Sequence, residues 1–79
     1  MDLPNPLITI SPDRMSGAPC FTGTRVPVQT LFDHLEYGDT IEIFLEDFPS
    51  VSREHAVAVL KLAHQAAIAR VADTKLAAE

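Results

Sequence analysis

The sequence predicts a mainly α-helical domain, with three helices in helix-turn-helix (homeodomain-like) order and a small two-strand β element at the N-terminus. Two observations support this prediction. The chain has 79 residues, 47% hydrophobic and 22% charged, which fits one small core better than several domains or a disordered tail. Hydrophobic residues recur at helical spacing after residue 27, whereas proline and glycine are concentrated before it.

The N-terminal part predicts two short strands joined by an ordered loop. Residues 7–10 form a β-prone run between Pro6 and Ser11, and a run of four suits an edge strand. The β-branched residues in 24–26 predict a second strand that pairs with 7–10. The expected organisation is an N-terminal tail over 1–6, the helix-turn-helix domain over 7–70, and a helix extension or frayed tail over 71–79.

Residues 28–37 predict the first helix. Their hydrophobic residues follow the i, i+3, i+4, i+7 spacing of one helical face, and Gly38 supplies the left-handed conformation in which helices often end. The same spacing over 41–48 predicts a second, short helix. Asp39 and Thr40 are both good N-caps for this helix, and Asp39 with Glu42 has the spacing of a capping box.

A third, longer helix is predicted from Arg53 onward, with Ser52 as its N-cap. Its expected core stripe consists of Ala56, Leu60, Ala63, Ala67 and Val71. The helix has more hydrophobic surface than one small core needs, and the first two helices are too short to cover its distal half. We therefore expect this half to pack on another chain, as a homodimer or with a different partner, through Leu62, Ile68, Val71 and Leu76.

The helix-turn-helix order suggests a nucleic-acid interface at the start of the third helix. It would present Ser52, Arg53, His55 and Lys61 to operator DNA. A plain three-helix bundle without a DNA role explains the same order equally well. The net charge of −5 opposes DNA binding, as does an acidic run without Lys or Arg. This run comprises Asp33, Glu36, Asp39, Glu42, Glu46 and Asp47. It is read either as a solvated face or as a docking face for a basic partner.

Enzymatic, metal and cofactor chemistry are not expected. His55 and His64 lie nine residues apart, on opposite sides of one helix, and His34 has no ligand at paired spacing. Cys20 has no nearby base and is expected to be a packed residue that anchors the loop. No segment reaches the roughly 20 apolar residues needed to span a bilayer, and no secretory signal is evident, so a cytoplasmic location is expected.

The segment Gly17-Ala18-Pro19-Cys20-Phe21-Thr22-Gly23-Thr24-Arg25-Val26-Pro27-Val28 resembles the signature of the domain-of-unknown-function family 433, G-x-P-C-x-x-G-T-R-[IV]-P-V. Residues 43–49 resemble a second run of that family, and the resemblance covers roughly residues 7–70. The signature residues Gly17, Pro19, Cys20, Gly23, Thr24, Arg25 and Pro27 are interpreted as structural. They would shape the loop that seats the first helix, and Arg25 would bind loop carbonyls in preference to phosphate.

This resemblance implies an antitoxin that neutralises a PIN-like ribonuclease toxin by direct binding and represses its own operon. A stand-alone DNA-binding regulator and a non-catalytic dimerisation module are the alternatives. The resemblance does not identify site residues.

Overall fold

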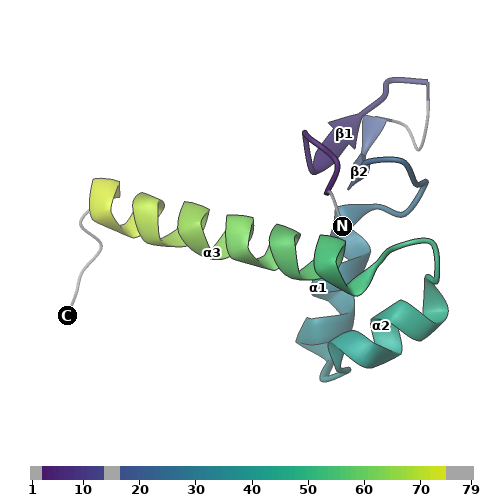
Figure 1. Cartoon of the computed structure of the whole chain (residues 1–79). Helices are drawn as coiled ribbons and strands as arrows, with labels where there is room; N and C mark the ends of the chain where they lie inside the picture. The colour runs from purple at the N-terminus through teal and green to yellow at the C-terminus, as the bar shows by residue number, and fades with distance from the viewer. Residues whose placement is uncertain (1–2, 14–16, 75–79) are drawn as a thin grey trace.

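The computed structural model describes residues 3–13 and 17–74. The elements follow in the order β1 (Ile8–Ile10), β2 (Pro19–Phe21), α1 (Val28–Tyr37), α2 (Ile41–Asp47) and α3 (Arg53–Thr74). In the view of Figure 1 the two strands lie above the start of α3, α2 lies below it, and α1 runs behind it from the strands toward α2. This arrangement confirms the predicted class, a three-helix domain with a small N-terminal β element.

The two strands form an antiparallel sheet, in which Ile8 pairs with Phe21, Thr9 with Cys20 and Ile10 with Pro19. The prediction of the first strand is confirmed, but the second strand was wrongly placed at 24–26. Those residues instead follow a turn at 22–23 as a bend, in which the Thr24 hydroxyl donates to the Phe21 carbonyl at 2.8 Å and accepts from Val26 N–H at 3.0 Å. Gly23 sits in this turn with a φ of 85°, which a residue with a Cβ adopts only with strain.

Helices α1 and α2 begin and end where their sequence signals place them. Gly38 ends α1 in the left-handed conformation, with a φ of 102°. At the start of α2 the Thr40 hydroxyl accepts from Ile43 N–H at 3.3 Å, so Thr40 is the cap and the Asp39–Glu42 box is not formed. The predicted cap of α3 is confirmed, since Ser52 Oγ accepts from His55 N–H at 3.0 Å.

The core is a cluster of buried residues contributed by β2, the following loop and all three helices. It consists of Phe21, Val26, Val28, Leu31, Phe44, Val51, Ala56 and Val59. Three phenylalanine rings form a continuous row: the ring centroids of Phe21 and Phe44 lie 5.8 Å apart, and those of Phe44 and Phe48 lie 5.2 Å apart. The aromatic side chains therefore connect the sheet to α2 across the centre of the body.

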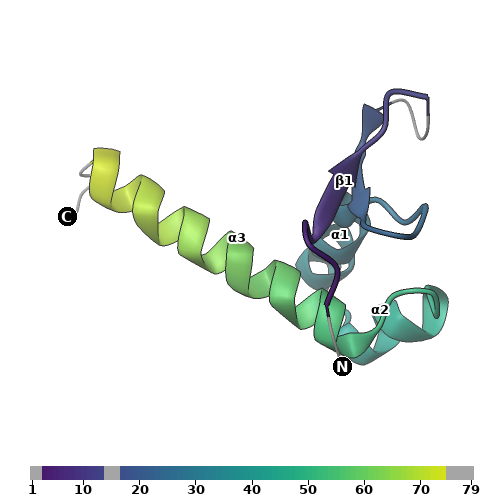
Figure 2. The same ribbon diagram turned by 45° about the horizontal axis from the view of Figure 1, so that its top comes forward.

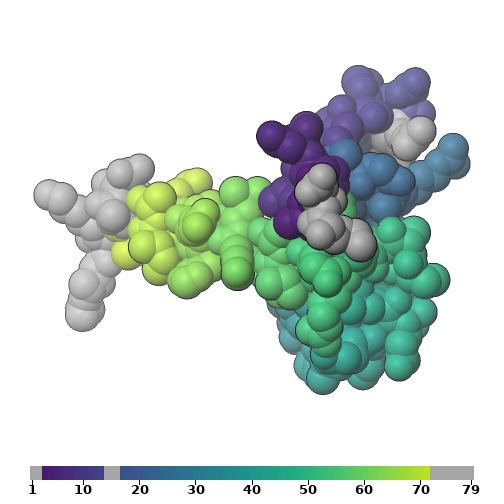
Figure 3. Space-filling model, viewed as in Figure 1, coloured from purple at the N-terminus to yellow at the C-terminus, as the bar shows by residue number. Residues whose placement is uncertain are grey.

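Helix α3 contributes to this core through its first two turns. His55, Ala56 and Val59 are buried, whereas Ala67 and Val71 of the predicted core stripe are exposed. We call residues 61–74 of α3 the arm. From Lys61 to Val71 every side chain except Ala63 is exposed, and the arm projects from the body as a straight rod (Figures 2 and 3). None of the described helices is long and apolar enough to cross a membrane.

Replacing the central ring tests this description of the core. Phe44→Ala is expected to lower the free energy of unfolding by about 3–5 kcal/mol, because Phe44 is fully buried among other rings. Half-buried Phe48→Ala is expected to lose less, and Phe44→Leu provides a milder change if the alanine variant does not fold. Urea denaturation measures all three, and equal losses at positions 44 and 48 would contradict the assignment of Phe44 as the centre.

Candidate protein-binding surfaces

The residues predicted to contact DNA do not form one exposed surface. His55 is only 5% exposed, and its Nε2–H donates to the Leu7 carbonyl at 2.9 Å, so the His55 side chain packs in the core. Ser52 is exposed, but its hydroxyl is used as the cap of α3. Arg53 forms an ion pair with Glu42 of α2, and Lys61 is exposed one and a half turns beyond His55. Of the residues predicted to contact DNA, two exposed cations remain, Arg53 and Lys61, and Glu42 already pairs with Arg53.

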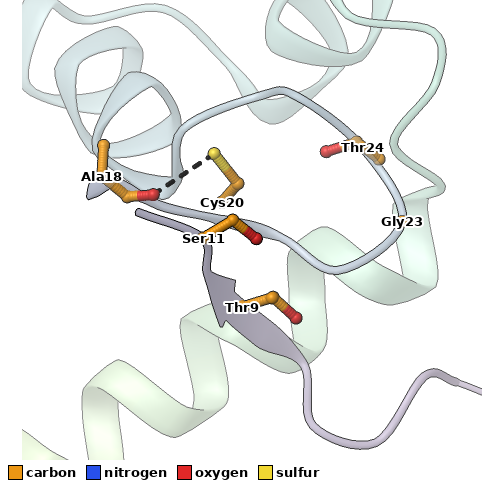
Figure 4. A pocket seen from close by; sticks show the side chains of 6 residues that line it. All are labelled: Thr9, Ser11, Ala18, Cys20, Gly23 and Thr24. Carbon is orange, nitrogen blue, oxygen red and sulfur yellow. Dashed lines mark hydrogen bonds between the residues drawn. The ribbon is translucent and has the colours of Figure 1, made fainter. Parts of the chain in front are cut away.

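The signature loop contains a buried cysteine and an exposed arginine. Buried Cys20 donates its thiol hydrogen to the Ala18 carbonyl at 3.5 Å, beside a cavity of about 30 Å³ (Figure 4). A cavity of this size has room for about one water molecule and none for a substrate. The expected internal role of Arg25 is wrong, because its side chain is exposed and no hydrogen bond or ion pair joins it to another described residue.

The predicted interface residues on the arm are exposed where the structure describes them. Leu62 is 44% exposed, Ile68 60% and Val71 48%. Leu76 lies outside the described residues. At 100° per residue Leu62 lies on the opposite side of the helix from Ile68 and Val71, so the arm carries two separate hydrophobic edges.

A groove of about 440 Å³ lies at the base of α3. Its lining is mostly apolar and consists of Leu3, Arg53, Glu54, Val57, Ala58 and Lys61. The Arg53–Glu42 ion pair places acidic α2 next to this groove. No pattern in the sequence indicates the groove, because Leu3 comes from the segment predicted to be a tail.

The acidic run lies on α1, on α2 and in the link between the two helices. We call it the acidic face, and define it as the six acidic residues from Asp33 to Asp47 with the exposed hydrophobic residues Tyr37 and Ile43. Five of the six acidic residues are exposed, and Asp39 is half-buried. Tyr37 is 86% exposed, and Ile43 is exposed as well. The helical spacing contained a signal for both, because each lies about half a turn away from the buried stripe of its own helix.

His34 joins the two helices of the acidic face. Its Nδ1 lies 3.0 Å from the Thr30 carbonyl of α1, and its Nε2 lies 3.1 Å from the Asp47 carboxylate of α2. Carbonyl and carboxylate oxygens only accept hydrogen bonds, so both bonds exist together only when the imidazole carries two protons. The bond to Asp47 raises the pKa of His34 above its ordinary 6.5, and the bond to Thr30 and the nearby Asp39 carboxylate add to the rise.

No three His, Cys, Asp or Glu residues come close enough together to hold a metal ion in the part of the chain that the structure describes. His55 and His34 are both engaged in hydrogen bonds, and the third histidine, His64, is exposed on the arm.

The His34 bridge predicts a pH dependence of stability. Because the folded-state pKa is raised, the contribution is fully present below the unfolded-state pKa near 6.5 and is lost as the pH rises through the folded-state pKa. Urea denaturation at a series of pH values is expected to show this loss in the wild type. His34→Gln keeps a donor toward Asp47 but cannot titrate, so it should lack the loss. Identical pH profiles for the two proteins would contradict the bridge.

Comparison with known proteins places the chain in a family. The uncharacterized protein y4eO of Sinorhizobium fredii (strain NBRC 101917 / NGR234) is 40% identical over 48 residues, which cover 61% of this chain and 22% of y4eO. The chain thus matches about a fifth of the length of that relative. No solved structure matches the chain. The model of the family described as "Protein of unknown function (DUF433)" matches residues 8–63, which include the signature loop, and the chain therefore belongs to the DUF433 family.

Proposed function

We propose that this protein is a cytoplasmic, non-catalytic antitoxin that binds a PIN-like ribonuclease toxin and covers its RNA-binding groove. The supporting observation is the acidic face, where six acidic residues of α1, α2 and their link occur together with an almost fully exposed tyrosine. A ribonuclease needs basic surroundings to hold RNA, and an acidic protein surface is complementary to them.

The charges of the acidic face are available to such a partner. Asp33 accepts a hydrogen bond from Gln29, and Asp47 and Glu42 are bonded to His34 and Arg53. For Glu36 and Glu46 no bond to another described side chain is seen, and both are exposed. Exposed charges mainly accelerate association and select the partner, so we assign them specificity more than affinity.

Affinity requires hydrophobic anchors as well. Tyrosine is enriched among the residues that dominate binding energy, because its ring buries a large area at a small entropic cost and its hydroxyl still bonds to the partner. Tyr37 lies next to Glu36 at the exposed end of α1, and Ile43 lies next to Glu42 in the first turn of α2. These two residues are the proposed anchors.

The alternative function, a stand-alone helix-turn-helix regulator, has weaker support. Its contact set is reduced to Lys61 and an Arg53 that is paired with Glu42, since His55 is buried. Repression of its own operon therefore remains a secondary proposal, and a bare dimerisation module remains the third candidate function.

Tyr37→Ala is expected to weaken toxin binding by about 2 kcal/mol, a factor of roughly 30, without changing the fold, because the side chain has few contacts within the chain. The test uses the protein encoded by the neighbouring gene, which the proposal expects to be PIN-like, with affinity measured by calorimetry and neutralisation by protection of RNA from cleavage. Failure of the wild type to bind the adjacent gene product would overturn the antitoxin proposal.

Removal of charge tests the acidic face separately. Glu36→Gln with Glu46→Gln is expected to slow association and to reduce its dependence on salt. Asp13→Asn is the matched control, because it removes an exposed carboxylate outside the acidic face. An equal effect of Asp13→Asn would indicate that net charge, and not this surface, determines binding.

Promoter DNA distinguishes the regulator from the antitoxin. Tight binding of its own promoter by the lone protein, with a steep salt dependence that Arg53→Ala abolishes, would replace the antitoxin by the regulator. We expect the lone protein to bind its promoter weakly, and Arg53→Ala to leave toxin binding intact.

A further inference from the structure

We propose that two copies of this chain exchange arms, and that the arm of each copy lies antiparallel along α3 of the other with its tip in the groove at the base. The proposal identifies the occupant of the groove as residues 68–71 of a second copy. It rests on the arm and the groove, and it stands independently of the antitoxin proposal.

The first support is the alignment of the groove with one edge of the arm. Val57, Lys61, His64, Ile68 and Val71 lie within about 40° of one line along α3, with alternating spacings of four and three residues. Such spacing is that of helices that pack along their length. Val57 and Lys61 line the groove at one end of this line, and Ile68 and Val71 are exposed at the other end.

The second support is self-complementarity. A twofold symmetric dimer requires that a surface contain both halves of each contact. His64 lies midway along the line, with Val57 seven residues before it and Val71 seven residues after it. With the twofold axis beside His64, Val57 of one copy therefore meets Val71 of the other, and Ile68 meets the aliphatic stem of Lys61 at the edge of the groove.

The third support is charge. Residues 61–74 contain Lys61, Arg70 and Asp73, a formal charge of +1, whereas residues 28–47 contain six acidic residues and no Lys or Arg. The Arg53–Glu42 ion pair brings the acidic helix α2 to the edge of the groove. An arm that enters the groove thus moves a basic segment toward an acidic body, and the same attraction acts twice in the symmetric pair.

Sedimentation equilibrium of the full chain tests the assembly. The wild type is expected to have twice the mass of one chain, which is 8.6 kDa. Ile68→Asp should raise the dimer dissociation constant at least about tenfold, since it removes a buried aliphatic side chain from the interface. Leu62→Asp is the matched control, because Leu62 is similarly exposed but lies on the other edge of the arm. A monomeric wild type, or equal effects of the two substitutions, would overturn the proposal.

Cysteine cross-linking tests the antiparallel register. A mixture of the single variants Val57→Cys and Val71→Cys is expected to form a disulfide between unlike chains, and His64→Cys is expected to form one between like chains. Val57→Cys alone should not cross-link, because the two copies of residue 57 lie about 21 Å apart along paired antiparallel helices. The wild type serves as the blank, since its Cys20 is buried. Efficient cross-linking of Val57→Cys with itself would indicate parallel arms and overturn the proposal.

Discussion

The hydrogen bond between His55 and the Leu7 carbonyl is the constraint on which the arrangement of the body depends. A two-stranded sheet with three residues per strand is marginal on its own, so it needs a helix to pack against. His55 supplies this link, because its Nε2–H bonds to the backbone just before β1 while its ring meets Phe21 of β2 edge to face, at 5.1 Å. The same Leu7 carbonyl also accepts from Thr22 N–H at 3.0 Å. One carbonyl thus joins the sheet, the signature loop and α3.

This packing divides the molecule into a body and an arm with opposite charge. The first two turns of α3 pack into the core. The rest of the helix extends beyond α1 and α2, because both of these helices are much shorter than α3. Six acidic residues lie on α1, α2 and the link between them, and the basic residues of α3 lie along the groove and the arm. The two partners that we propose would therefore use surfaces of different character: the acidic face suits a basic protein, and the line from Val57 to Val71 suits a second copy. The proposed dimer also covers Lys61, so a partner arm and DNA would compete for the start of α3.

The sequence predicts the helices well because their signals are local. Hydrophobic spacing defines α1, Gly38 and Ser52 mark helix ends, and the prediction that the distal part of α3 is uncovered follows from helix lengths alone. The second strand was misplaced because the β-branched residues Thr24 and Val26 give residues 24–26 a higher strand propensity than residues 19–21, which begin with a proline. In the structure Pro19 is tolerated as the first residue of an edge strand, and Thr24 uses its hydroxyl in a turn.

The error at His55 arose because the role of a polar side chain can depend on a contact distant in the chain. The helix-turn-helix order predicts that His55 is exposed, because its hydrogen-bond partner, the Leu7 carbonyl, lies 48 residues away in the sequence and gives no local signal. If His55 is placed in the core, the predicted buried stripe of α3 passes through Val59 and no longer through Ala67, as in the structure. Tyr37 was overlooked because it contributes to no hydrophobic stripe, which is also why it remains exposed.

The continuity of α3 has a consequence for the rate at which any partner is captured. A free peptide of the arm's length is a marginal helix in water, because the first turn must form before later hydrogen bonds compensate for the lost freedom. Here the core holds the preceding turns in helical form, so the arm elongates an existing helix and needs no nucleation. A partner consequently encounters a preformed rod, and capture proceeds by docking without a folding step that would slow it.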